Sequence, residues 1–68
     1  MKSYKIGLKI KEFREAAGLS QAELARKVGT TPYQISIYEA DKQNMSLPRF
    51  VMICEALGVE MVDMVRNL

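Results

Sequence analysis

Apolar residues recur at intervals of three and four along most of the chain, and this spacing predicts helices rather than strands. The first such stretch, about Tyr4 to Ala17, has one apolar face, formed by Ile6, Ile10, Phe13 and Ala17. Four further helices follow: one from about Gln21 to Gly29, one over Pro32 to about Glu39, one that Ser46 caps and that runs to about Leu57, and one over about Glu60 to Asn67. The predicted fold class is all-α, with five helices.

Glycines stand where these apolar patterns stop. Gly18, Gly29 and Gly58 each follow a predicted helix, and glycine adopts the left-handed backbone that ends helices at little cost. The fourth helix is expected to turn one set of side chains inward: Phe50, Val51, Ile53, Cys54 and Leu57.

Residues 20–39 carry start signals for two short helices. Ser20 and Glu23 form the S-x-x-E box that caps a helix start. Thr31 offers a second capping hydroxyl, and Pro32 suits the first helical position, where its missing N–H is not needed. Gln34 stands three residues after Thr31, where it can close a second capping box.

These two helices are separated by three or four residues, with Gly29 in the turn. That spacing is typical of a helix-turn-helix, whose second helix can lie in the major groove of DNA. The first helix supplies small and branched packing surface from Ala22, Leu24, Ala25 and Val28. In the second helix, periodicity places Ile35 and Tyr38 inward.

The chain resembles the Cro and phage-repressor type of helix-turn-helix domain, also called the xenobiotic-response-element family, from about Ile6 to Val65. The resemblance is carried by four features: Arg14, LSQAELARKVG at 19–29, the TxxxISIYE pattern at 31–39, and LPRFVMICEALGV at 47–59. It implies one domain over residues 1–68, with a compact λ-repressor-like arrangement and the helix-turn-helix unit at 20–39.

By this resemblance, the positions that touch bases are Pro32, Tyr33, Ser36 and Ile37. Several relatives have amide side chains at the first two of these positions, so we expect a less polar readout here, with Ile37 against a thymine methyl. For Tyr33 and Ile37 the alternative is a role as surface residues only. Gln34 has two interpretations, helix capping and base contact.

The resemblance also implies a phosphate contact from Gln21 and an ion pair between Arg14 and Glu39, with Arg14 reaching a phosphate as well. Further candidates for the phosphate backbone bracket the second helix of the unit: Thr31, Lys42, Gln43 and Asn44. Lys42 has the alternative of a solvated loop charge. Asp41 stands where the family often has glycine and is expected to bring a negative charge near the phosphates.

Charge is distributed unevenly along the chain. The formal net charge is only +2. Residues 1–49 hold nine Lys and Arg against five acidic residues, whereas residues 50–68 hold one Arg against three acidic residues. This asymmetry is compatible with a phosphate-facing surface on the helix-turn-helix part and a different role for the C-terminal end.

The C-terminal part is rich in apolar side chains, which suggests a homodimer. The operators that this family reads are commonly two-fold symmetric, because a single short helix touches few bases, and the resemblance therefore also implies a homodimer. The expected interface comprises Met52, Met61, Met64, Val65 and Leu68, beside Val62. Some of these side chains are expected to close the core instead, Val62 and Val65 before the others.

Several functional classes are excluded by the residues present. The chain has no histidine, no cluster of metal ligands and no phosphate-binding glycine loop, so we expect neither an enzyme nor a cofactor, metal or small-molecule ligand. No apolar stretch is long enough for a membrane span or signal peptide. The single cysteine, Cys54, is expected to be a buried thiol, and a reducing cytoplasm is the expected location.

The sequence therefore predicts a small transcriptional regulator, a repressor or autoregulator that binds double-stranded DNA as a homodimer. The alternative is a protein-interaction module, or an antitoxin-type partner-binding protein, that uses the same fold.

Overall fold

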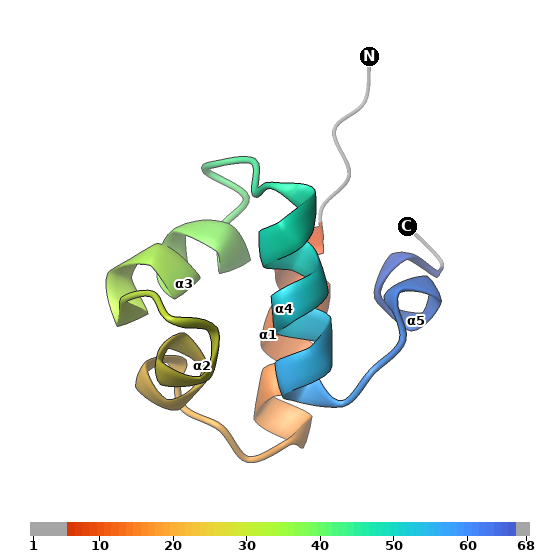
Figure 1. Ribbon diagram of the computed structural model, residues 1–68, viewed down its shortest axis with the longest axis horizontal. Coiled ribbons are helices and arrows are strands. Elements are labelled where there is room, and N and C mark those ends of the chain that lie inside the picture. The colour runs from red at the N-terminus through yellow and green to blue at the C-terminus, as the bar shows by residue number, and fades with distance from the viewer. Residues whose placement is uncertain (1–5, 67–68) are drawn as a thin grey trace.

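The computed structural model describes residues 6–66, which form five helices: α1 (Ile6–Ala16), α2 (Gln21–Val28), α3 (Pro32–Glu39), α4 (Leu47–Leu57) and α5 (Met61–Val65). In Figure 1, α4 crosses in front of α1 at the centre, α2 and α3 lie on one side, and α5 lies on the other. The all-α prediction is confirmed. The expected start at Tyr4, the expected end at Asn67, and Leu68 lie outside the described residues.

One apolar core joins all five helices. α3 packs on α1 and α2, while α4 packs on α2, and α5 packs on α1 and α4. The core residues are Ile10, Leu24, Ala25, Val28, Ile35, Tyr38, Ile53, Cys54, Leu57 and Met64. Burial raises the pKa of the Cys54 thiol, which fits the predicted structural role.

The signals that end the helices are confirmed. Gly18, Gly29 and Gly58 all have φ between 71° and 75°, in the left-handed region. α1 ends at Ala16 rather than at Ala17, and the side chain of Ala17 is exposed instead of forming the last inward position. Ala22, expected on the packing face of α2, is exposed as well.

The expected burial pattern of α5 is wrong. Met64 is fully buried, whereas Val62 and Val65 are 56% and 42% exposed. The helix has only five residues and spans little more than one turn, so a single position faces the core, and Val62 lies nearly opposite to it. The long, flexible side chain of Met64 fills that position. Met64 is therefore a core residue and not part of an interface.

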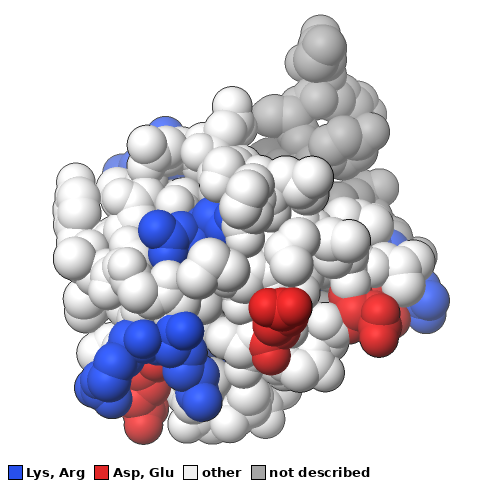
Figure 2. Space-filling view, in the orientation of Figure 1, with Lys and Arg blue, Asp and Glu red and all other residues white. Residues whose placement is uncertain are grey.

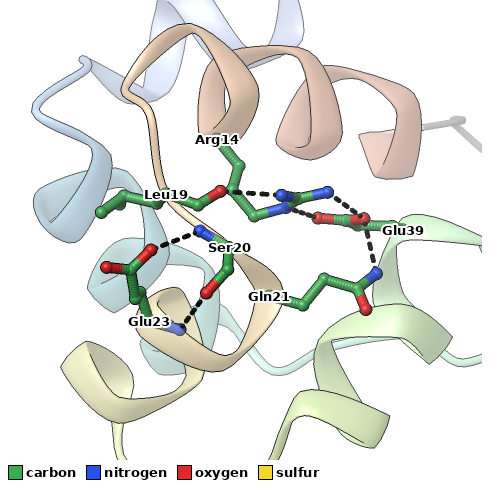
Figure 3. A network of polar contacts seen from close by, with 6 residues as sticks. All are labelled: Arg14, Leu19, Ser20, Gln21, Glu23 and Glu39. Carbon is green, nitrogen blue, oxygen red and sulfur yellow. Dashed lines mark hydrogen bonds and ion pairs between the residues drawn. The ribbon is translucent and has the colours of Figure 1, made fainter.

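An ion pair between α1 and α3 is buried in the structure (Figure 3). Arg14 Nε and Nη2 donate to the two carboxylate oxygens of Glu39, at 2.6 and 3.2 Å. Arg14 Nη1 also donates to the Leu19 carbonyl at 2.8 Å, and Gln21 Nε2 donates to Glu39 Oε1 at 3.1 Å. Hydrogen bonding to Glu39 raises the pKa of Arg14, outweighing the opposing effect of burial. The predicted Arg14–Glu39 pair is confirmed.

A glycine allows α1 to approach the end of α3. A Cβ atom built on Gly7 would lie against the backbone carbonyl oxygens of Tyr38 and Glu39, closer than real Cβ contacts allow. The Gly7 N–H also donates to Asp41 Oδ1 at 3.0 Å. No pattern in the sequence indicated this close contact.

We expect Gly7→Ala to lower the free energy of unfolding by about 1–3 kcal/mol, because the added methyl group has no space. The sign is diagnostic, since replacing glycine by alanine inside a helix otherwise stabilises by about 0.5–1 kcal/mol. Urea unfolding followed by circular dichroism measures the change. Leu8→Ala, at a residue that is 58% exposed, is the control, and a more stable Gly7→Ala variant would contradict the packing described here.

We expect Arg14→Ala and Glu39→Ala each to destabilise the protein by about 3–5 kcal/mol, because each leaves a buried charge without its partner. The double variant should lose less than the two single losses together. The exposed pair Arg66–Asp63, with N···O at 3.7 Å, is the matched control, and Arg66→Ala should cost at most about 1 kcal/mol. Equal effects of Arg14→Ala and Arg66→Ala would rule out a buried pair.

Candidate nucleic-acid interface

The outer face of α3 is the exposed side of the predicted helix-turn-helix. Ile35 and Tyr38 are 0% and 8% exposed and hold the inner side of the helix in the core, as predicted. Tyr33, on the outer side, is 72% exposed. Pro32 is exposed as well, while Ser36 and Ile37 are half-buried. The structure therefore brings together on one face the residues expected to contact bases.

The outer face of α3 carries few polar side-chain atoms. The Ser36 hydroxyl donates to the Tyr33 carbonyl at 2.6 Å. Pro32 has no donor and Ile37 has no polar side-chain atom. Glu39 is the charged residue of α3, and it is bound to Arg14. The chemistry available on this face is therefore mainly aromatic and aliphatic, with hydroxyl and amide groups beside it.

The start of α3 has half of the predicted capping box. Thr31 Oγ1 accepts from the Gln34 N–H at 3.1 Å, as expected. The side chain of Gln34 does not return to Thr31; its Nε2 donates to Gln43 Oε1 at 2.6 Å. The expected second half of the box is wrong, because the loop after α3 comes close enough to bind the Gln34 amide.

The start of α2 has both halves of its box (Figure 3). The Glu23 N–H donates to Ser20 Oγ at 3.0 Å, and the Ser20 N–H donates to Glu23 Oε1 at 2.8 Å. Hydrogen bonding from the Ser20 backbone lowers the pKa of Glu23. A carboxylate charge is therefore present at neutral pH at this helix N-terminus, where it is favourable.

Arg14 of α1 and Gln21 of α2 were both expected to contact phosphates, and Arg14 is buried. Arg14 is 8% exposed and its three guanidinium nitrogens all donate inside the protein. This burial argues against the expected phosphate contact, and the role of Arg14 is to anchor Glu39. Gln21 is half-buried at the first position of α2. Its Nε2 is oriented by Glu39.

The loop after α3 exposes three of the expected phosphate ligands, Lys42, Gln43 and Asn44. Asp41 precedes them with φ 57°, in the left-handed region that glycine adopts more easily. Its carboxylate accepts from Gly7 near the N-terminus of α1, where the helix dipole favours a negative charge. Asp41 therefore joins α1 to the end of α3, a function that the sequence did not indicate.

Positive charge gathers over α2 rather than α3. On the face that Figure 2 shows, a cluster of Lys and Arg lies over α2 with an acidic residue beside it, and most Asp and Glu lie toward α4 and α5. Arg26 and Lys27 are exposed in the last turn of α2. Arg49 Nη1, near the start of α4, donates to the Val28 carbonyl at 2.6 Å. These three basic residues were not among the predicted site residues, although all three lie in the sequence blocks that carry the family resemblance.

Within residues 6–66 no three His, Cys, Asp or Glu side chains are grouped so that they could hold a metal ion. None of the helices in that range is both long and apolar enough to span a membrane.

Known proteins share this arrangement. A family model described as helix-turn-helix matches residues 10–64. An uncharacterized helix-turn-helix-type transcriptional regulator of Rickettsia conorii is 42% identical over 52 residues, which are 76% of this chain. The chain spans only 42% of the length of that relative.

Solved structures agree on the fold. The restriction-modification controller protein C.AhdI from Aeromonas hydrophila is 31% identical, with a TM-score of 0.84 over 90% of this chain and 92% of that one. The P22 c2 repressor, solved with a synthetic operator, is 20% identical, with a TM-score of 0.84 over 97% and 100% of the two chains. The chain therefore belongs to the helix-turn-helix family, of the Cro/C1 type, whose fold is that of DNA-binding transcription regulators.

Proposed function

We propose that this chain binds double-stranded DNA sequence-specifically, with the outer face of α3 in the major groove. The observation that carries the proposal is that α3 exposes its outer face while its inner side is attached to α1 and α2. Glu39 ties α3 to Arg14 of α1 and Gln21 of α2. A fixed helix can present side chains to base edges with little loss of freedom on binding.

The base contacts in this proposal come from the residues that share or border that face: Pro32, Tyr33, Gln34, Ser36 and Ile37. Tyr33 and Ile37 supply apolar surface for thymine methyl groups. Tyr33 adds a phenol hydroxyl, and Ser36 retains acceptor capacity. Gln34 contributes an amide at the edge of the face.

The phosphate contacts come from the two ends of the motif. Gln21 and Thr31 lie at helix N-termini, where side chains and backbone N–H groups favour phosphate oxygens. The exposed loop residues Lys42 and Asn44, on either side of Gln43, act from the other end of α3.

The proposed role is that of a repressor or autoregulator, which acts by binding and not by catalysis. The support is the likeness to C.AhdI, a restriction-modification controller protein, at 31% identity over nine tenths of the chain. The buried thiol of Cys54 is compatible with action in the cytoplasm.

We expect Tyr33→Ala and Ile37→Ala to relax the preference at particular base pairs, and Gln21→Ala to weaken binding to all sequences about equally. Selection from randomised duplexes, followed by titration of selected and scrambled DNA, measures both effects. Wild-type affinity should fall steeply as salt rises.

Salt-independent binding to another protein, with no response to duplex DNA in dilute buffer, would favour an interaction module instead. Equal losses on selected and scrambled DNA for all three variants would show that the assigned roles are wrong.

We also propose that the chain binds as a homodimer through α5 and the adjacent side of α4. Exposed apolar side chains gather there: Met52, Met61, Val62 and Val65 are 42–56% exposed. An open groove of about 540 Å³ is lined by parts of both segments, including Val51, Met61 and Val62. α3 and α5 lie at opposite ends of the molecule (Figure 1), so this contact leaves α3 free for DNA.

We expect Val62→Asp to shift the protein toward monomer, because the substitution buries a charge in an apolar interface. Sedimentation velocity at tens of micromolar measures the state. Leu47→Asp, at an exposed apolar residue near the other end of α4, is the matched control and should leave the dimer intact. A wild-type protein that sediments only as monomer would contradict this part of the proposal.

A further inference from the structure

Two glutamine side chains join the first turn of α3 to the loop that follows the helix. Gln34 Nε2 donates to Gln43 Oε1 at 2.6 Å, across nine positions of sequence. Gln43 is exposed and Gln34 is half-buried at the edge of the α3 outer face, beside Ile37. The bond holds the Gln34 amide in one orientation at the proposed DNA surface.

Among the described residues 6–66, one N–H donor and the carbonyl oxygen of the Gln34 amide have no hydrogen-bond partner. A primary amide has two N–H donors and one carbonyl oxygen, and the bond to Gln43 uses one donor. The remaining N–H and Oε1 match the N7 acceptor and N6 donor that adenine presents in the major groove. Without Gln43, the amide could rotate and exchange its donor and acceptor ends.

Other side chains on the same face are poorly suited to this bidentate readout. Pro32 and Ile37 have no side-chain donors, and the Ser36 hydroxyl hydrogen is donated to Tyr33. Capping does not compete for Gln34, since its side chain binds the loop instead of Thr31. Gln34 is therefore the side chain of this face with an amide available for a base edge.

We propose that Gln34 reads an adenine and that Gln43 is its positioning residue, the two acting as one unit. This inference rests on the proposed function, because it requires α3 to lie in the major groove. It assigns Gln43 a role in specificity in place of the phosphate contact expected from its position in the sequence.

The test begins with sites selected by the wild-type chain from randomised duplexes, and repeats the selection with Gln34→Ala and Gln43→Ala. Both variants should lose the preference for adenine at the same base pair, by roughly 5- to 150-fold. The double variant should lose no more than Gln34→Ala alone, because Gln43 acts through Gln34.

Two further measurements separate positioning from phosphate binding. Gln43→Glu keeps an acceptor for Gln34, so it should retain the adenine preference while weakening binding to every sequence through repulsion of phosphates. Replacing that adenine by 7-deazaadenine removes the N7 acceptor. It should weaken wild-type binding and leave Gln34→Ala unaffected.

A Gln43→Ala variant that binds all sequences equally less well, with its motif unchanged, would overturn the inference and leave the proposed function intact. Insensitivity of the wild type to 7-deazaadenine at each adenine of the selected site would overturn it as well. A wild-type chain that binds no duplex in dilute buffer would remove the proposed function itself, and this inference with it. Circular dichroism melting should show all variants folded, because Gln43 is exposed, Gln34 is only half-buried, and neither belongs to the core.

Discussion

The bidentate contact between Arg14 and Glu39 sets the geometry of the side of the molecule that carries α3, which we propose faces DNA. Removing two charges from water is costly, and the side chains are only 10% and 5% exposed. The cost is offset because every guanidinium nitrogen has an acceptor and both carboxylate oxygens have donors. Such a pair fixes direction as well as distance, since the guanidinium donors are planar. α3 is thereby held at one angle to α1 and α2.

The features that sequence analysis predicted correctly are local. The Ser20–Glu23 box and the inward positions Ile35 and Tyr38 each depend on spacings of three or four residues. The boundaries of α2, α3 and α4 followed for the same reason, since glycines and capping residues act within one turn. The family resemblance added the Arg14–Glu39 pair, which no local pattern specifies, because its members are 25 positions apart.

The features that were missed depend on how segments meet in space. Gly7 is small because the α3 carbonyl groups lie against it, and that approach is set by the packing of two helices. Gln34 satisfied a capping pattern, but a loop nine residues later offered its amide a partner. Val62 was expected in the core and Met64 at an interface, but Met64 is buried and Val62 is exposed. A helix of five residues is too short for the spacing of apolar residues to indicate which position faces inward. The proposed roles of individual residues at DNA are likewise not specified by spacing alone.

The contacts of Asp41 have a consequence for how the protein would fit against a DNA duplex. Its left-handed backbone and its bond to Gly7 attach the end of α3 to the start of α1. Arg14, farther along α1, binds Glu39 of α3 as well. Tilting α3 would require several such attachments to break at once. In a complex with DNA, adjustment of groove width or helical bend would therefore fall to the duplex, and operators that deform easily would be favoured even at base pairs that no side chain touches.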